Sequence, residues 1–419
     1  MGTILVKLKG FQKLTSTDEA LQNWLNILQF GGPKMVDVGL QDALSRVLAE
    51  DLFAQEDLPR FNKSAMDGYA VKSGDLVDAT QFKPVILQLT SAEQVEAKEA
   101  KQVWTGNPIP KGADAVIMIE NTRKSVGGLE VWSQLAPGDN VSKRGEDVKK
   151  SDLVAKAGTR LNPYHIGLAA ALGYTQLKVA QKPKIAILPT GNELAELGTD
   201  RAANQIYDSN KTMISALCHE LGAETTDCGL AKDNLDEIAE KIKSALKTND
   251  AIITTGGTSV GGLDLLPDAV NKLGKPGVIV HGIALRPAMP TAVAILEGKP
   301  VLILSGNPVA AVIGFEVFGR PLICRMLGMN REEPRPIIKA KLVKRVTSAL
   351  GRKTYVRVCV SLKNGEFIAE PVSAKGSGSI STMTQSNGFV IVPENREGLS
   401  EGETVVVQMF GNLEDANNI

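Results

Sequence analysis

Apolar and polar residues follow one another with a helical period near the start of the chain. Within residues 15–50, Ser16 and Glu19 have the spacing of a capping box, which is typical of a helix start. Apolar positions then recur three or four residues apart, at Ala20, Trp24, Ile27 and Leu28. A second helix is predicted over residues 41–50, because the same spacing recurs at Ala43, Leu44, Val47 and Leu48.

From Leu58 to about Lys150 the pattern changes to that of a small β-rich domain. Short apolar runs are separated there by glycine, proline and asparagine, as at residues 85–89, 115–119 and 129–132. Helical spacing returns in residues 151–180. We therefore expect a split helical domain made of residues 1–58 and 150–182, into which residues 59–149 are inserted as a β-rich domain.

Residues 183–331 alternate between strand and helix patterns. Strands are predicted at 184–188, 251–254, 278–281, 292–296 and 301–304. Helices are predicted after the cap-rich Asp208-Ser209-Asn210, from Leu235 to Ala245, and from Val309. This alternation predicts an α/β domain with a mostly parallel sheet, which binds ligands at the carboxyl ends of its strands.

Residues 332–419 have the pattern of an all-β domain. Apolar and polar residues alternate over 353–360 and 389–392, and turn signals occur at Asn364-Gly365 and Asn387-Gly388. The fold class predicted for the whole chain is therefore multidomain α/β plus β.

Composition excludes several classes of protein. The 419 residues carry 47 basic and 47 acidic side chains, so a general nucleic-acid binder is not expected. Four cysteines without a CxxC pair and three scattered histidines argue against a zinc site, which leaves hard cations on oxygen ligands. The first residues lack a signal-peptide core, and residues 300–318 are too interrupted to span a membrane. We expect a cytoplasmic protein.

Candidate chemistry lies in loops of the α/β segment that follow predicted strands or begin a helix: Thr190–Leu194, Tyr207–Asn210, Thr255–Asp264 and Ser305–Pro308. Glycines at strand ends let backbone N–H groups approach an anion, and a helix N-terminus adds a favourable dipole. None matches a Walker loop or the GxGxxG fingerprint. Each alone is compatible with a plain turn, and Asp208 with a helix cap. Three such loops at the strand ends of one sheet favour a ligand site.

Charge is distributed unevenly between the two C-terminal segments. Residues 183–268 carry 7 basic against 14 acidic side chains, and residues 331–357 carry 9 against 2. Glu193, Asp208 and Asp264 project from the candidate loops, and Mg²⁺ favours a few carboxylates together with substrate phosphates. The imbalance is compatible with complementary domain surfaces. It is equally compatible with a carboxylate–Mg²⁺ half that faces a cationic half holding an oxyanion.

The β-rich insertion contains three dense polar segments. Phe61–Ala70 includes Asp67 among small residues, Thr105-Gly106 begins a second segment, and Lys143–Asp147 combines two bases with two acids. Taken separately, each is typical of a solvated turn.

Seven strings occur in the order and spacing of the MoeA/gephyrin family of molybdopterin molybdenumtransferases: SAMDGYAV, TGNPIPKGADAV, KRGEDV, PTGNEL, YDSN, GGTSVGGLD and SGNPVAA. The resemblance covers about residues 14 to 410. It implies a homodimer of four-domain subunits, with the split helical domain and its β-rich insertion, a MogA/MoaB-like α/β domain (183–331) and a C-terminal β-barrel (332–419). It also implies Mg²⁺-dependent insertion of molybdate into adenylylated molybdopterin with release of AMP. The site would lie between the α/β domain of one subunit and the β-rich domain of the other.

The resemblance also implies roles for particular residues. Its functional acids match Asp67, Asp147, Glu193 and Asp264, of which Asp264, Glu193 and Asp67 would hold Mg²⁺. Its substrate-binding positions match Thr105, Asp208, Ser209, Gly256, Gly257, Ser259 and Gly261. The molybdate environment matches Arg286, Pro287, Arg357 and Ser386.

One motif departs from the family. The family's KPGKP is Arg286-Pro287-Ala288-Met289-Pro290 here, so that Met289 replaces the second lysine and an anion contact is in question. The alternatives are a tungstate-inserting paralogue, a molybdopterin adenylyltransferase, and a scaffold that keeps the fold without catalysis. A MogA/MoaB-like adenylyltransferase is an expected partner, whereas nucleic acid and membranes are not.

Overall fold

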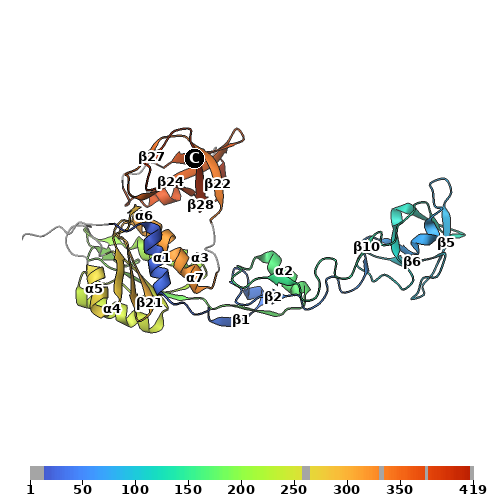
Figure 1. Ribbon diagram of the computed structural model, residues 1–419, viewed down its shortest axis with the longest axis horizontal. Helices are drawn as coiled ribbons and strands as arrows, with labels where there is room; N and C mark the ends of the chain where they lie inside the picture. The colour runs from blue at the N-terminus through green and yellow to red at the C-terminus, as the bar shows by residue number, and fades with distance from the viewer. Residues whose placement is uncertain (1–13, 257–264, 330–334, 373–375, 416–419) are drawn as a thin grey trace, which may run out of the picture. The chain divides into compact units, whose positions relative to one another are not determined.

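The chain forms two packing units, which we call the small unit (residues 37–179) and the large unit (residues 1–36 and 180–419). The structure, a computed structural model, describes residues 14–256, 265–329, 335–372 and 376–415. Within these residues no helix is long and apolar enough to cross a membrane. Figure 1 labels the elements.

The small unit is built around a six-stranded sheet with the strand order β7-β4-β6-β5-β9-β8. Its strands are β4 (Gly68–Val71), β5 (Val85–Leu89), β6 (Glu99–Val103), β7 (Ala115–Met118), β8 (Thr122–Ser125) and β9 (Gly128–Val131). Tyr69, Leu87 and Ile117 are buried in its core. The β-rich pattern predicted for this segment is therefore confirmed.

Shorter elements complete the small unit. Two-stranded pairings join β1 (Met35–Gly39) to β12 (Gln176–Ala180), β2 (Leu52–Phe53) to β11 (Leu153–Ala155), and β3 (Lys63–Ser64) to β10 (Val141–Ser142). The helices are α2 (Pro163–Ala171) and the 3₁₀ turns η1 (Leu40–Asp42), η2 (Ser73–Leu76) and η3 (Ile119–Asn121). Residues 151–180 are thus helical only in α2, which Asn162 caps.

The helix predicted over residues 41–50 is wrong. Ser45 has a positive φ of 62°, and beyond η1 the chain is not helical. Val47 and Leu48 are buried, and they form isolated bridges with Arg160 and Val179. Their apolar side chains are buried through this long-range pairing. The helical spacing of the apolar residues therefore does not reflect a helix here.

The large unit contains the predicted α/β sheet, whose strand order is β16-β13-β17-β21-β20-β18. The strands are β13 (Lys184–Pro189), β16 (Glu224–Asp227), β17 (Ala251–Thr255), β18 (Gly277–His281), β20 (Ala292–Leu296) and β21 (Lys299–Leu304). The pairs β16–β13, β13–β17 and β17–β21 are parallel, and β20 and β18 are antiparallel to their neighbours. The order reverses at β13 and β17, which is where an open α/β sheet binds its ligand.

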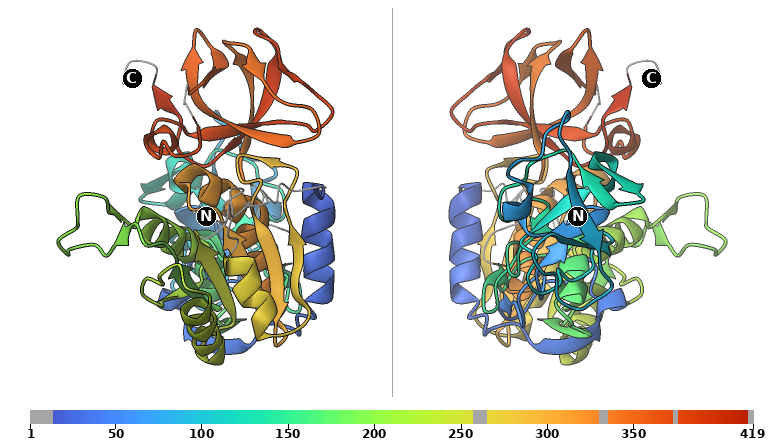
Figure 2. Two further views of the ribbon diagram at one scale, coloured as in Figure 1. Left: turned by 90° about the vertical axis from the view of Figure 1, so that its left-hand side faces the viewer. Right: turned by 90° about the vertical axis from the view of Figure 1, so that its right-hand side faces the viewer.

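Helices cover this sheet, and short strands flank it. They are α1 (Thr17–Ile27), α3 (Ser209–Glu220), α4 (Leu235–Thr248), α5 (Leu265–Leu273), α6 (Pro308–Gly314), the π-helical η4 (Phe315–Gly319), α7 (Arg320–Met326), β14 (Leu194–Ala195), β15 (Ile206–Tyr207) and β19 (Leu285–Arg286). Helix α1 lies beside the sheet (Figure 2). Trp24 Nε1 joins it to β20 by donating to the Ala294 carbonyl at 2.9 Å. Residues 14–36 thus belong to the large unit, whereas the sequence-based division placed them with residues 150–182.

The C-terminal residues form a closed five-stranded barrel. The ring β24-β25-β22-β28-β26 closes through an antiparallel pairing of β24 with β26. The elements are β22 (Ile337–Leu342), β23 (Val346–Thr347), β24 (Lys353–Lys363), β25 (Glu366–Pro371), α8 (Ser381–Thr384), β26 (Gly388–Val392), β27 (Gly398–Leu399), β28 (Thr404–Met409) and β29 (Glu414–Asp415). Strand β19 pairs with β24 and so joins the α/β domain to the barrel.

Of the two predicted barrel turns, one is confirmed. Asn364 and Gly365 have φ values of 50° and 81° and connect β24 to β25. The prediction of a turn at Asn387-Gly388 is wrong, since Gly388 begins β26. The Asn387 side chain is buried and exchanges hydrogen bonds of 2.7 and 2.9 Å with the backbone of Val360.

Candidate functional site

Three loops of the large unit meet at the carboxyl ends of β13, β17 and β21. Gly256, which follows β17, has a φ of +96°, and a Cβ at this position would lie 2.1 Å from the Thr190 carbonyl oxygen. A Cβ on Gly306, after β21, would lie 3.5 Å from the Gly256 Cα atom. Only a residue without a side chain fits between Thr190 and the neighbouring loop. Glycine at position 256 thus allows the loop after β17 to pack closely against the loop after β13.

The N-terminus of α3 reaches the same edge. Asp208 Oδ1 accepts from the backbone N–H groups of Asn210 and Lys211, at 3.0 and 3.2 Å. Asn210 Nδ2 donates to the Gly306 carbonyl at 2.8 Å, which ties the helix to the loop after β21. Ser209, the first residue of the helix, is exposed. The motif thus caps the helix, as its simplest interpretation predicts, and also holds a second loop in place.

Two buried acceptor atoms at this helix end are unused. Asp208 is only 3% exposed, and its Oδ2 has no hydrogen-bond partner among the described residues; the same holds for Asn210 Oδ1. Burial raises the pKa of Asp208. Buried polar atoms are normally paired, so these two point to a bound donor or cation.

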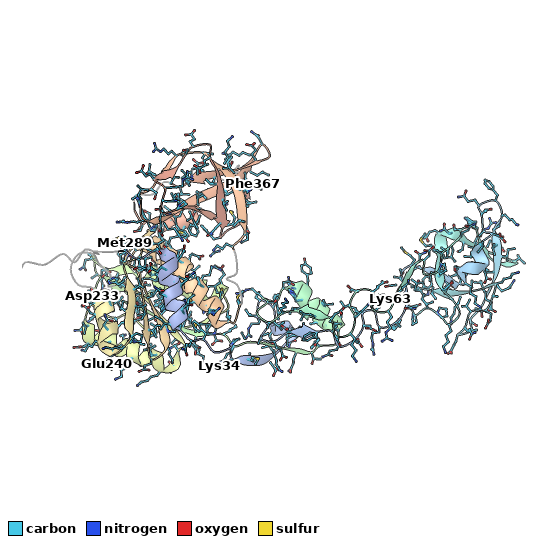
Figure 3. All side chains as sticks on the ribbon, viewed as in Figure 1. Lys34, Lys63, Asp233, Glu240, Met289 and Phe367 are labelled. Atoms are coloured by element: carbon cyan, nitrogen blue, oxygen red, sulfur yellow. The ribbon has the colours of Figure 1, made fainter. Side chains whose placement is uncertain are left out.

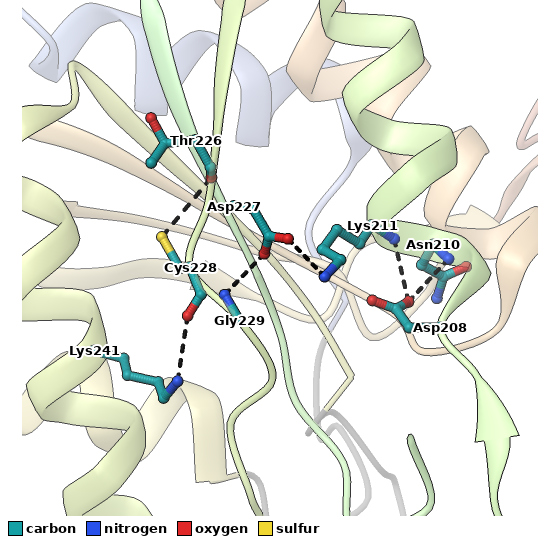
Figure 4. A network of polar contacts seen from close by, with 8 residues as sticks. All are labelled: Asp208, Asn210, Lys211, Thr226, Asp227, Cys228, Gly229 and Lys241. Atoms are coloured by element: carbon teal, nitrogen blue, oxygen red, sulfur yellow. Dashed lines mark hydrogen bonds and ion pairs between the residues drawn. The ribbon is translucent and has the colours of Figure 1, made fainter. Parts of the chain in front are cut away.

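A polar network extends from this helix across to β16 (Figure 4). Lys211 Nζ lies 2.8 Å from Asp227 Oδ2, and Asp227 Oδ1 accepts from the Gly229 N–H. Burial is the largest single influence on Asp227 and opposes its ionisation, but the hydrogen bonds from Lys211 and Gly229 and the charges of Lys211 and Lys241 together lower its pKa. The sheet edge is therefore held by charged side chains that already have partners.

Glu193 and an acid that the sequence reasoning missed lie in neighbouring loops. Glu193 is exposed, and its carboxylate folds over Gly191, where a Cβ would lie 2.6 Å from Oε2. Asn192 and Asp233 exchange two hydrogen bonds of 3.2 Å, which bring Asp233 to the Glu193 loop (Figure 3). Asp233 follows β16, a strand that the hydrophobic pattern does not predict, so its loop was not among the strand-end loops singled out from the sequence. Gly257, Ser259, Gly261 and Asp264 lie outside the described residues.

In the small unit the three motif segments converge. The Ser64 N–H donates to the Asn107 carbonyl at 2.8 Å, and the Arg144 N–H donates to Asn62 Oδ1 at 2.8 Å. These bonds join the Phe61–Ala70 segment to the two segments that follow it. Asp147, in the third segment, has an exposed side chain, and its N–H donates to the Leu58 carbonyl.

Asp67 and Thr105 are in direct contact. The backbone N–H and the hydroxyl of Thr105 both donate to Asp67 Oδ1 at 2.7 Å. These two bonds, the backbone one first, lower the pKa of Asp67. The second oxygen of this exposed carboxylate remains available to a ligand.

A cleft of about 570 Å³ lies between the α/β domain and the barrel, both within the large unit. Its lining includes four arginines, Arg286 from the α/β domain and Arg345, Arg352 and Arg357 from the barrel, and no acidic residue among those that the structure describes. Met289 lies in the same lining (Figure 3). A cleft with four cations and no carboxylate fits an oxyanion.

The predicted molybdate residues behave differently from one another. Arg286, Pro287 and Arg357 line the cleft. The Arg357 Nε is buried without a hydrogen-bond partner among the described residues, and burial lowers the pKa of its guanidinium, which stays charged. Ser386 is not among the lining residues, and its hydroxyl donates to the Thr382 carbonyl at 2.7 Å.

The cleft and the sheet edge share one turn. Ser305 and Asn307 line the cleft, while Gly306 between them contacts Gly256 and accepts from Asn210. A ligand at the sheet edge and an anion in the cleft would therefore touch opposite sides of one four-residue turn.

Carboxylates of the described residues do not form a ready-made metal cage. Within residues 14–415, apart from the gaps given above, no group of three or more His, Cys, Asp or Glu side chains is arranged to hold a metal ion. Mg²⁺ usually takes one or two carboxylates and completes its shell with substrate phosphates and water. Within the large unit, the exposed Glu193 and the unused Oδ2 of Asp208 fit that kind of donor set.

Family profiles match three successive segments of the chain. The MoeA N-terminal region (domain I and II) matches residues 15–173, a molybdopterin-binding domain profile matches residues 186–325, and the MoeA C-terminal region (domain IV) matches residues 339–410. Fold and profiles together thus define a multidomain protein that contains a domain of the molybdopterin-binding class.

Individual proteins agree with these profiles. A protein of Methanocaldococcus jannaschii, provisionally named as a molybdopterin biosynthesis protein, is 37% identical over 96% of this chain and 99% of its own. A molybdopterin molybdenumtransferase of Staphylococcus aureus is 35% identical over 92% of this chain and 93% of its own. The crystal structure of the molybdopterin biosynthesis moeA protein of Pyrococcus horikoshii matches with a TM-score of 0.82 at 31% identity, over 95% of this chain and 100% of its own. The chain belongs to the MoeA family.

Proposed function

We propose that this protein is a molybdopterin molybdenumtransferase, which inserts molybdate into adenylylated molybdopterin and releases AMP. The observation that carries the proposal is the shared turn at residues 305–308. It has an unpaired arginine cleft on one side and a glycine-lined sheet edge on the other. A phosphorylated substrate at the edge and an oxyanion in the cleft would meet at this turn.

At the sheet edge, the chain's own groups bind and orient the substrate. Gly256 lets the phosphates approach the backbone, with Gly257, Ser259 and Gly261 extending the same loop in sequence. The buried free oxygens of Asp208 and Asn210 accept hydrogen bonds from substrate N–H groups. Thr105 acts indirectly, because it holds Asp67 in its charged form.

In the cleft, arginine side chains receive molybdate as the second substrate. Arg357 is the strongest candidate, because its buried Nε has an unfilled bond and a guanidinium matches a tetrahedral oxyanion. Arg286 approaches from the opposite wall, together with Pro287. No protein nucleophile is required, since the sulfur ligands of the metal belong to the pterin.

Mg²⁺ is the proposed cofactor, held by Glu193, Asp264 and Asp67, with Asp147 as a further functional acid. When bound, it would neutralise negative charge on the pyrophosphate group of the substrate, the group that is cleaved when AMP is released. The carboxylates themselves keep the ion beside the phosphates and away from the arginine cleft. Among the described residues, the cleft lining contains no acid, which supports this separation.

We further propose a homodimer in which each subunit completes the site of the other. Asp67 and Glu193 belong to different units of the chain, and the family resemblance assigns them to different subunits of one site. Each variant alone should be inactive. A mixed dimer of Asp67→Asn and Glu193→Gln subunits has one intact site of two, so it should have about half of the wild-type activity, and a random mixture of subunits about a quarter. Mixed dimers as inactive as the parents would contradict this arrangement.

The alternative function is molybdopterin adenylylation, the expected activity of a partner with a MogA/MoaB-like domain. The test supplies the purified protein either with molybdopterin and ATP or with adenylylated molybdopterin and molybdate. Turnover of only the second pair supports the transferase. Turnover of only the first pair would replace it with the adenylyltransferase, and turnover of neither would favour the scaffold.

A further inference from the structure

The arginine cleft contains more positive charge than the proposed molybdate residues account for. Arg345 and Arg352 line it in addition to Arg286 and Arg357. Among the described residues, none of the four guanidinium groups has a carboxylate partner. Four fixed cations around one cavity repel one another unless an anion is present.

Several arginines outside the cleft are paired with carboxylates, in contrast to the four that line it. Arg396, on the same barrel, binds both carboxylate oxygens of Glu403 at 2.8 and 3.1 Å. Arg320 and Arg335 both bind Glu316. These other arginines of the large unit thus have an acidic partner, although Arg201 instead lies over the Tyr207 ring. What sets the cleft apart is that four arginines without a carboxylate partner line one cavity.

Strand pairing brings Arg352 to the loop that contains Met289. Strand β19 ends at Arg286 and pairs in parallel with the start of β24, so that Leu285 is opposite Lys353 and Arg286 is opposite Thr354. Lys353 is engaged by Asp18 at 2.7 Å, whereas its neighbour Arg352 lines the cleft. On the side of the cleft formed by residues 286–290, Arg286 is the one cation. The barrel side contributes three, Arg345, Arg352 and Arg357.

We infer that Arg345 and Arg352 are oxyanion-binding residues, which supply from the barrel the positive charge that Met289 does not supply from the opposite loop. The inference rests on the proposed function, and it names two residues that the family resemblance does not. Arg352, which is partly buried, contributes more than the exposed Arg345, because solvent screens an exposed charge.

The experiment measures sodium molybdate binding to the full-length protein by isothermal titration calorimetry, without pterin. We expect Arg352→Gln to raise the Kd about tenfold and Arg345→Gln about threefold, the range of a lost charge-assisted hydrogen bond at partial exposure. The matched control is Lys339→Gln, which removes one charge from β22 of the same barrel outside the cleft lining. It should leave the Kd unchanged. Met289→Lys should restore most of the affinity lost in Arg352→Gln.

Three results of these titrations would overturn the inference. Wild-type Kd in both arginine variants, with binding lost in Arg357→Gln, would overturn the inference and leave the proposed function intact. An equal loss in Lys339→Gln would overturn it too, since the effect would then be one of overall charge. Absence of molybdate binding by the wild-type protein would overturn the proposed function and the inference together. Circular dichroism spectra and thermal melts of each variant establish that it is folded.

Discussion

Thr105 donates two hydrogen bonds to a single oxygen of Asp67, one from its backbone N–H and one from its hydroxyl, each 2.7 Å long. The pair connects two sequence motifs that are 38 residues apart. Both side chains are exposed, so the contact contributes little to stability. Its effect is on charge: it holds the pKa of Asp67 below the usual value and leaves the other carboxylate oxygen unused.

Replacing Thr105 with valine should raise the pKa of Asp67 part of the way to its usual value. The hydroxyl donor is lost, but the backbone N–H, which has the larger effect, remains. A depressed pKa favours the folded, charged form above the unfolded-state pKa, and that advantage is lost as the pH falls through the folded-state pKa. The acid limb of the pH–activity profile should therefore move to higher pH. Carbon NMR titration of the Asp67 carboxyl, with Thr122→Val as control, checks the shift.

Asp208→Asn should separate helix capping from ligand binding. Asparagine caps as well as aspartate, whereas Asp208→Ala should lose about 1 kcal/mol of stability. Burial raises the pKa of Asp208, so the wild-type protein loses stability as the pH rises from the unfolded-state pKa through the raised value. Thermal melts at pH 4 and 8 should show that loss in the wild type and not in Asp208→Asn. An asparagine variant with full substrate affinity would contradict the assigned role in ligand binding.

Gly256→Ala should disrupt the sheet edge by steric overlap. The new Cβ would lie 2.1 Å from the Thr190 carbonyl oxygen, so a loop must move. Gly298→Ala is the matched control, because Gly298 also has a positive φ, of 74°, but has open space around its Cβ. The control should lose about 1 kcal/mol from backbone strain alone. Gly256→Ala should lose more and also lose substrate binding, as measured by thermal melts and titration.

Glu316→Gln should destabilise the large unit strongly. Glu316 is 8% exposed at its side chain and lies between the guanidinium groups of Arg320 and Arg335, at 3.1 and 2.6 Å. Removing its charge takes the shared carboxylate from two largely buried cations, of which Arg320 keeps Glu220 at 3.5 Å, at a cost of about 3 kcal/mol. Glu403→Gln, which breaks the more exposed pair with Arg396, should cost at most about 1 kcal/mol. Equal losses in denaturant unfolding would show that burial does not set the strength of these pairs.

Helices and strands that are marked by nearby residues, such as an apolar run or a capping side chain, were predictable from the sequence. The α/β strands are continuous apolar runs because both of their faces are buried, and the helices between them begin at side-chain caps such as Asp208 and Asn234. The helix predicted over residues 41–50 was wrong because the spacing of Val47 and Leu48 indicates that they are buried but does not indicate which residues they pack against. Their partners, Arg160 and Val179, lie more than a hundred residues further along the chain.

The candidate site was predictable where strand ends or charge marked it. The basic balance of residues 331–357 anticipated the arginine cleft, since Arg345, Arg352 and Arg357 all come from that segment. The position of Ser386 was not predictable, because its hydroxyl is used by the Thr382 carbonyl of a short helix. Asp233 was missed because the strand before its loop, β16, is polar and mostly exposed and so gives no strand signal in the sequence.

The central claim is that the protein couples an oxyanion in the arginine cleft to departure of AMP from a substrate at the sheet edge. The most direct test incubates the purified protein with adenylylated molybdopterin and Mg²⁺, with and without molybdate, and measures the AMP released. AMP release that depends on molybdate, and that falls about tenfold or more in Arg357→Gln, is the predicted result. Release of AMP at the same rate without molybdate, or unchanged in Arg357→Gln, would contradict the account.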